Sequence, residues 1–134
     1  MAYEAVLFDL DGTLLDTLQD IASYANNVLG RLGFPQHELE AYKYFVGDGR
    51  ETLALRILPS SRRDATTVAK VVACIDSEYS QHWADTTRPY EGIPELLQVL
   101  TVRGIKMAVL SNKPDDSAKL EVSKLLPHWQ FELI

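Results

Sequence analysis

Cysteine, long apolar runs and leader-like features are scarce in this sequence. The single cysteine, Cys74, cannot form an intrachain disulfide. The three histidines, His37, His82 and His128, are too dispersed for a recognisable zinc-site spacing. Every apolar run falls far short of the roughly 18 residues that a membrane span needs, and the first residues include Glu4, where a secretory signal would be basic. We therefore expect a cytoplasmic protein that does not enter a membrane.

Positive charge is also in short supply. Acidic residues number 19 against 13 basic ones, which gives a net charge of -6 and a pI near 5.0. This balance argues against a broad basic surface, and hence against a nucleic-acid partner, but it allows a local positive pocket for a small anion. The 134 residues are 46% hydrophobic and 24% charged, as in soluble globular proteins. The length suits one domain, or one small domain with part of another.

Short apolar runs predict buried strands. The run at residues 5–8 stops abruptly at Asp9, which is typical of a strand buried on both faces that enters a loop. Residues 105–110 repeat this pattern and lead into the polar segment that begins at Ser111. Residues 131–134 are the candidate for a third strand.

The remaining chain has mostly helical periodicity. The order is strand, helical insert, helix, strand and helix, which predicts an α/β fold. We expect a Rossmann-like parallel sheet core, incomplete in this chain, with an inserted α-helical cap domain. The predicted boundaries are 1–15 and 88–134 for the core and 16–87 for the cap domain.

Two acidic residues follow the first predicted strand. Asp9 and Asp11 are two positions apart, so an extended backbone would direct both carboxylates to one side of the sheet edge. One acid can then act as a nucleophile while the other carries a proton. Both suit a magnesium ion, and Gly12 permits close backbone approach to a phosphate. The alternative is an ordinary turn, for which Asp, Gly and Thr are common residues.

The second predicted strand ends in Ser111 and Asn112, which supply hydroxyl and amide donors. Lys113 adds a nearby positive charge, and the helix that follows presents its positive end to the same region. Taken alone, the segment also reads as a routine strand-to-helix turn. Ligands of parallel α/β sheets bind beyond the carboxyl ends of the strands, so this loop and the Asp9 loop are expected at one edge.

These motifs are similar to those of a known family. Residues 8–14, Phe-Asp-Leu-Asp-Gly-Thr-Leu, closely followed by Asp16, resemble the first motif of the haloacid dehalogenase-like hydrolase superfamily. Residues 109–113, Val-Leu-Ser-Asn-Lys, resemble its second motif, and the helical segment between them is similar to its cap domain. Together with residues 89–94, Pro-Tyr-Glu-Gly-Ile-Pro, the chain most resembles the phosphoglycolate phosphatase branch.

The resemblance implies a magnesium-dependent phosphomonoester hydrolase with an aspartyl-phosphate intermediate. Asp9 would attack phosphorus, and Asp11 would protonate the leaving alcohol and then activate water. Magnesium would bind the Asp9 carboxylate and the Asp11 backbone carbonyl. True dehalogenases lack the second acid, so Asp11 favours phosphate esters over haloacids.

The resemblance also assigns the phosphate-binding residues. Ser111 would hold a phosphoryl oxygen with the amides of Gly12 and Asn112, and Thr13 would support the loop. Lys113 would add charge to the same substrate-binding set. Thr13 fits phosphatases better than sugar-phosphate mutases, which often have valine at this position.

Residues 47–50, Gly-Asp-Gly-Arg, resemble the cap loop that closes over the site. By that resemblance Arg50 would meet a substrate carboxylate or phosphate through its planar guanidinium. The alternative is a solvated arginine near the start of a helix.

Two later elements of the family pattern have no counterpart. The family continues with a lysine that neutralises the phosphoryl group and an acidic motif that completes the magnesium site. Lys119 and Lys124 come too early, and Glu132 is the one acidic residue beyond Glu121. We therefore expect a fragment with about half a catalytic core and with absent or impaired activity; Lys113 taking the missing lysine's place is the alternative.

Other hypotheses remain open at this point. The expected partner is a small phosphorylated metabolite, and the same machinery would serve a pyrophosphatase or a nucleotide phosphatase. A non-catalytic module that binds a phosphorylated ligand would also account for the missing motifs. A third hypothesis is a half-core that completes its sheet by forming a homodimer.

Overall fold

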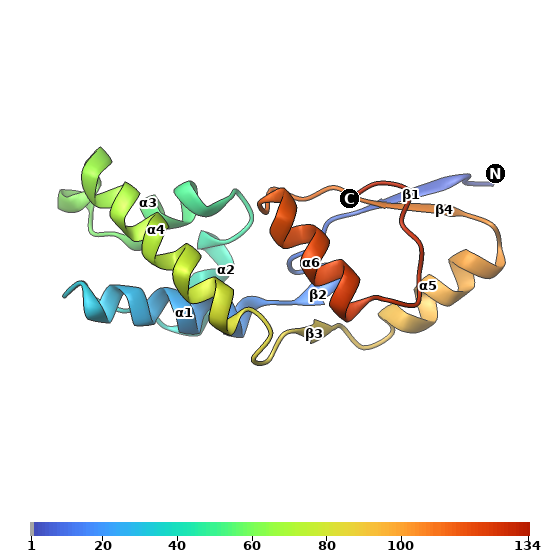
Figure 1. The fold of residues 1–134 in the computed structure, drawn as a ribbon, viewed down its shortest axis with the longest axis horizontal. Helices are drawn as coiled ribbons and strands as arrows, with labels where there is room; N and C mark the ends of the chain where they lie inside the picture. The colour runs from blue at the N-terminus through green and yellow to red at the C-terminus, as the bar shows by residue number, and fades with distance from the viewer. Residues whose placement is uncertain (1) are drawn as a thin grey trace. The chain divides into compact units, whose positions relative to one another are not determined.

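The computed structural model describes residues 2–134 and divides them into two compact units (Figure 1). The first unit consists of the chain up to Asp16 and of Arg88–Ile134, and the second is Thr17–Thr87. Asp16 thus lies in the first unit, one residue beyond the predicted boundary. The elements in chain order are β1 (Ala5–Phe8), β2 (Leu15–Asp16), α1 (Leu18–Arg31), η1 (Leu39–Ala41), α2 (Tyr42–Phe45), α3 (Arg50–Ile57), η2 (Ser60–Arg62), α4 (Ala65–His82), β3 (Arg88–Pro89), α5 (Ile93–Val102), β4 (Lys106–Val109) and α6 (Asp115–Leu125).

The two longest strands of the first unit pair in parallel, as the α/β prediction requires. The register places Phe8 of β1 opposite Val109 of β4. The N–H of Leu110 donates to the carbonyl of Phe8 at 2.8 Å, so the pairing continues to the end of both strands. In a parallel pair the carboxyl ends lie at one edge. The loops that begin at Asp9 and Ser111 therefore leave the same edge of the sheet.

The prediction of a third strand at residues 131–134 is wrong, although these residues lie beside β4. Glu132 N–H donates to the Met107 carbonyl at 2.8 Å, and Val109 N–H donates to the Leu133 carbonyl at 2.9 Å. The adjacent residues 132 and 133 thus pair with residues 107 and 109, which are two apart. In a regular parallel ladder the N–H and the carbonyl of one residue, here Glu132, would bond to residues 107 and 109, but the second bond is made by Leu133 instead. Residues 131–134 therefore run beside β4 without forming a regular ladder.

A second, very short sheet lies in the first unit. Leu15 pairs with Pro89 and Asp16 with Arg88 in an antiparallel arrangement between β2 and β3. Two-residue strands have no readable alternation, so the sequence pattern did not predict them. Their pairing brings together the two points where the helical insert begins and ends in the chain.

The core of the first unit forms between the sheet and its helices. Leu97 of α5 and Leu126, just after α6, are almost fully buried and belong to the same apolar cluster as β4. This packing follows the expected crossover, in which a helix between parallel strands covers a face of their sheet. The buried members are Phe8, Leu10, Leu14, Leu15, Leu97, Met107, Val109, Ala118, Val122 and Leu126.

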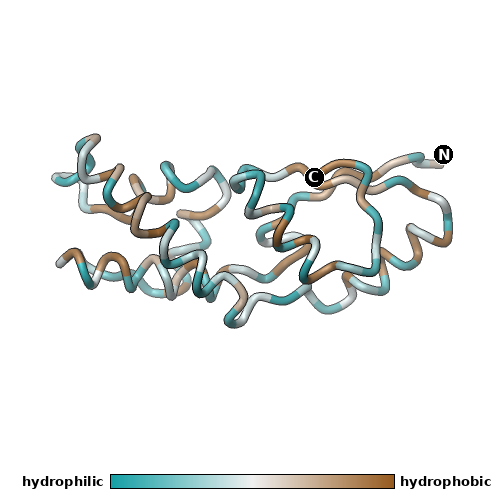
Figure 2. The backbone as a smooth tube through the Cα atoms, in the orientation of Figure 1, coloured by the Kyte–Doolittle hydropathy of each residue, from teal (hydrophilic) through white to brown (hydrophobic). Residues whose placement is uncertain are grey.

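The second unit is the predicted helical insert, and it has its own core. Figure 1 shows α1 beside α4, and Figure 2 shows hydrophobic and hydrophilic residues alternating along both helices. The apolar stripe of α1 faces α4, as its helical spacing predicts. Tyr42 is fully buried, and its hydroxyl donates to Asn26 Oδ1 at 2.7 Å.

Among the described residues, none of the helices has the length and apolar character that crossing a bilayer requires.

A buried carboxylate ties the two ends of this second unit together. Asp20, near the start of α1, is only 4% exposed. Its oxygens accept hydrogen bonds from the hydroxyls of Thr86 and Thr87, both at 2.7 Å, and from their backbone N–H groups. Burial alone would raise the pKa of Asp20, but these donors outweigh it and hold the pKa below its usual value.

This environment makes stability depend on pH. A carboxyl with a lowered folded-state pKa stabilises the fold above its unfolded pKa of about 3.9, and the contribution is lost as pH falls through the folded value. We expect Asp20→Asn to reduce the free energy of unfolding at pH 7 by about 1–3 kcal/mol and to weaken the loss of stability below pH ~4. Urea titrations at several pH values measure both effects. Asp116→Asn, an exposed control, should change stability by about 0.5 kcal/mol; equal effects of both variants would contradict the prediction.

Candidate active site

The loop after β1 is held in a fixed shape by its own backbone. The carbonyl of Leu10 accepts hydrogen bonds from the N–H groups of Leu14 and Leu15, both at 3.0 Å, and from that of Thr13 at 3.3 Å. Leu10, Leu14 and Leu15 are fully buried, so they anchor the loop in the core. Gly12 adopts φ +78°, and a Cβ there would meet no atom within 4 Å. Glycine is therefore required for its backbone angle and not for lack of space.

One cavity brings together three of the predicted site residues. Asp9, Ser111 and Asn112 line a cavity of about 310 Å³ at the edge where β1 and β4 end. Asp9 is exposed, and its Oδ1 accepts the N–H of Leu10 at 2.7 Å. A carboxylate thus stands beside hydroxyl and amide groups that can donate to an anion. The other lining residues are Leu7, Phe8 and Leu110.

The second loop leads directly into α6. Ser111 Oγ accepts the N–H of Lys113 at 3.0 Å, a local turn typical of serine. Pro114 precedes the first helical residue, where its fixed φ does not interrupt the helix. Asp115 and Asp116 occupy the first turn and favour the helix N-terminus electrostatically.

The second acid and the motif lysine meet in a buried charge cluster. Lys113 Nζ lies 3.0 Å from Asp11 Oδ1 and 2.6 Å from Glu121 Oε2. The side chains are 7% exposed for Lys113, 15% for Asp11 and 1% for Glu121. Asp11 Oδ1 is buried and has no hydrogen-bond partner among the described residues, so its contact with the ammonium is a charge contact without hydrogen-bond geometry.

Sequence reasoning did not identify Glu121 as part of the site. It lies on α6 among Ala118, Val122 and Leu125, at the spacing of an apolar stripe. Ala118 and Val122 are buried and Leu125 partly so. A charged residue on such a stripe is the signal that would have marked Glu121, because buried acids need a partner.

The donor set fits a hard divalent cation. Magnesium usually keeps several waters and takes only one or two protein carboxylates together with substrate phosphate. The exposed Asp9 carboxylate, which lines the cavity, and the Asp11 backbone carbonyl, which the family resemblance assigns to magnesium, are hard oxygen ligands of this kind. No group of three or more histidine, cysteine or acidic ligands gathers anywhere in residues 2–134. A cation here would therefore take its other ligands from phosphate and water.

Arg50 is engaged within the second unit. Its guanidinium pairs with Asp76 and lies over the ring of Tyr79, 4.3 Å from the ring centroid. Both partners belong to α4, and the Arg50 side chain is 16% exposed. Contact of Arg50 with substrate remains a prediction.

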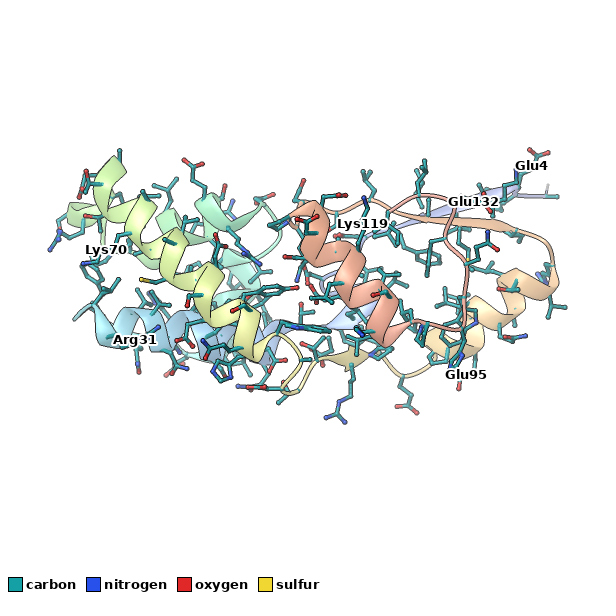
Figure 3. All side chains as sticks on the ribbon, viewed as in Figure 1. Glu4, Arg31, Lys70, Glu95, Lys119 and Glu132 are labelled. Atoms are coloured by element: carbon teal, nitrogen blue, oxygen red, sulfur yellow. The ribbon has the colours of Figure 1, made fainter. Side chains whose placement is uncertain are left out.

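Lys119 does not take part in the buried charge cluster. It pairs with Asp115 at 2.8 Å on the exposed side of α6 and is labelled in Figure 3. The hydrogen bond to Asp115 raises the pKa of Lys119. Among the described residues of the first unit, Lys113 is the lysine that lies beside an acidic residue of the first motif.

The sequence also matches a family model along almost its whole length. The model described as haloacid dehalogenase-like hydrolase matches residues 6–134. The chain belongs to this family. Its α/β fold, with parallel strands and a helical insert, agrees with that membership.

Within this family, the chain is similar to several curated phosphatases. The phosphoglycolate phosphatase of Thiobacillus denitrificans is 34% identical over 115 residues, which cover 84% of this chain and 51% of the relative. The phosphoglycolate phosphatase of Aquifex aeolicus is 32% identical over 129 residues, covering 96% and 58%. The N-acetylmuramic acid 6-phosphate phosphatase of Pseudomonas aeruginosa is 33% identical over 114 residues, covering 85% and 50%. The chain spans about half the length of the curated relatives it matches.

Solved structures share the fold. A candidate phosphoglycolate phosphatase from Lactobacillus delbrueckii subsp. bulgaricus superposes with a TM-score of 0.91 at 29% identity and covers 99% of this chain and 64% of its own. A predicted phosphatase from Clostridium acetobutylicum superposes with a TM-score of 0.84 at 26% identity, covering 100% and 61%.

Breaking the buried charge cluster should destabilise the first unit. Removing one member of a buried ion pair leaves an uncompensated charge and costs about 3–5 kcal/mol. We expect Lys113→Met to lower the free energy of unfolding by this amount, because two acidic side chains lose their cation. Lys119→Met removes an exposed pair of the same type and should cost about 0.5 kcal/mol or less. Urea unfolding of both variants compares them, and equal losses would contradict the burial argument.

Proposed function

We propose that the chain carries the nucleophile and general acid of a magnesium-dependent phosphomonoester hydrolase that forms an aspartyl-phosphate. The observation that carries this proposal is the cavity in which the Asp9 carboxylate adjoins the Ser111 hydroxyl and the Asn112 amide. Nucleophile and anion donors come from loops that leave one edge of the sheet, which is where parallel α/β proteins bind ligands. Membership of the hydrolase family supports the same reaction class.

The reaction assigns a role to each acid. An Asp9 oxygen attacks phosphorus, the bond from phosphorus to the leaving oxygen breaks, and Asp11 gives that oxygen its proton. Asp11 then takes a proton from the water that attacks the acyl phosphate, which releases phosphate and restores Asp9. Ser111 and the Asn112 amide hold the phosphoryl oxygens, while Thr13 supports the loop. The Gly12 N–H, which the family resemblance assigns to the same task, donates to the Leu15 carbonyl at 2.9 Å. The Asp9 carboxylate and the Asp11 backbone carbonyl would hold a magnesium ion, whose charge would offset the repulsion between the phosphate and the attacking carboxylate.

The substrate we propose is a small phosphorylated metabolite of the phosphoglycolate type. Two of the relatives are named for phosphoglycolate and a third for a sugar phosphate, and all three names describe phosphomonoesters. We further propose that the helical insert, Thr17–Thr87, is the cap domain, with Arg50 as its substrate contact, and that the protein acts in the cytoplasm. Residues 1–134 lack counterparts of the family's later lysine and acidic motif, so we expect this chain alone to have impaired turnover.

Asp9→Asn tests the nucleophile. The variant keeps the shape of the side chain but replaces the attacking carboxylate by an amide, so we expect magnesium-dependent release of phosphate from phosphoglycolate to fall by about 10³-fold or more. Asp116→Asn, an exposed acid on α6, is the matched control and should retain turnover.

A second readout separates chemistry from binding. Beryllium fluoride with magnesium imitates an aspartyl-phosphate, and its binding can be followed by fluorine NMR. We expect binding to the chain and to Asp116→Asn, and loss of binding in Asp9→Asn. Unchanged turnover in Asp9→Asn would overturn the proposed nucleophile. Binding without any turnover would instead favour the non-catalytic phosphate-binding module.

A further inference from the structure

Glu121 occupies a position where a charge is expensive. It lies on α6 with 1% of its side chain exposed, between the core residues Ala118 and Val122. An ionised carboxylate at such a place requires a cation and good hydrogen-bond geometry. The ammonium of Lys113 lies 2.6 Å from Glu121 Oε2, the distance of a strong charge-assisted bond.

The contacts of the Lys113 ammonium with Glu121 and with Asp11 differ in length and in hydrogen bonding. It lies closer to Glu121, at 2.6 Å, than to Asp11, at 3.0 Å. Asp11 Oδ1 receives no hydrogen bond within the described chain. The lysine is therefore held from the α6 side, and it supplies Asp11 with positive charge without occupying that oxygen through a directed hydrogen bond.

We propose that Glu121 is a positioning residue: it anchors Lys113 so that the ammonium stays beside Asp11 while the Asp11 carboxylate remains available to react. The inference rests on the proposed function for the role of Asp11 and goes beyond it in assigning Glu121. Without the Glu121 charge, Lys113 would still contact the Asp11 carboxylate. A direct hydrogen-bonded pair between the two would then occupy the oxygen that the reaction needs.

An NMR experiment tests the anchor without any turnover. The buried Lys113 ammonium should give a slowly exchanging proton-nitrogen signal in the 134-residue chain, because burial and hydrogen bonding slow its exchange. We expect the signal to be lost or strongly shifted in Glu121→Gln and to persist in Asp11→Asn. Lys113→Met assigns the signal. A signal that survives in Glu121→Gln, or that disappears only in Asp11→Asn, would overturn the proposal.

Kinetics test the consequence of the anchor. With phosphoglycolate and magnesium, Glu121→Gln should lower kcat by about 10- to 100-fold, up to the usual contribution of general acid-base catalysis, while KM changes about twofold or less. Glu121→Asp keeps the charge on a shorter side chain and should recover part of kcat. A parallel loss in kcat and folded protein, or no change in kcat, would overturn the positioning role.

A double variant guards against simple unfolding. Replacing a buried ion pair by apolar residues of similar volume is often neutral for stability. Lys113→Met with Glu121→Leu should therefore stay folded, as circular dichroism can verify, and its kcat should be as low as that of Glu121→Gln. A folded double variant with wild-type kcat would overturn the proposal. Absence of both turnover and beryllium fluoride binding in the wild-type chain would count against the proposed function, while the NMR result would still decide the anchor.

Discussion

The parallel pairing of β1 with β4 is the constraint on which the candidate site depends. It joins segments about a hundred positions apart and fixes Phe8 opposite Val109. Because side chains alternate along a strand, shifting β1 by one residue against β4 would change which residues of the two loops lie opposite each other. The register of this short pair of strands therefore determines which residues meet at the sheet edge. Asp9 stands with Ser111 in one cavity only because their strands end together.

The sequence predicted the elements that local patterns encode. The apolar runs at β1 and β4 stop at polar residues, and both strands lie where these runs predicted them. The helical periodicity predicted for the rest of the chain is confirmed by the long helices α1 and α4 of the insert and by α5 and α6. The α/β class follows from the order of these elements, so the fold was readable without long-range information.

Features that depend on packing between distant segments were not readable. No local pattern marks Asp20, because the groups that make it a buried anchor, Thr86 and Thr87, come from the far end of the insert. Glu121 acquires its partner only once the Lys113 loop folds back over α6. The segment after Trp129 has strand-like composition, but two hydrogen bonds out of step with β4 keep it irregular. In each case the tertiary partner, and not the local preference, decides the outcome.

The two ends of the helical insert have a topological consequence. β2 and β3 pair at the positions where the chain leaves and rejoins the first unit, and the Asp20 hydrogen bonds close the second unit just beyond them. The residues at which the insert ends therefore lie one strand spacing from the residues at which it begins, whatever residues lie between. Changes in the length or the surface of α1–α4 need not be transmitted through the backbone to the β1 and β4 loops. The helical insert is therefore a domain whose two ends are held together. Its helices can change in sequence and length during evolution while the β1 and β4 loops keep their sequence.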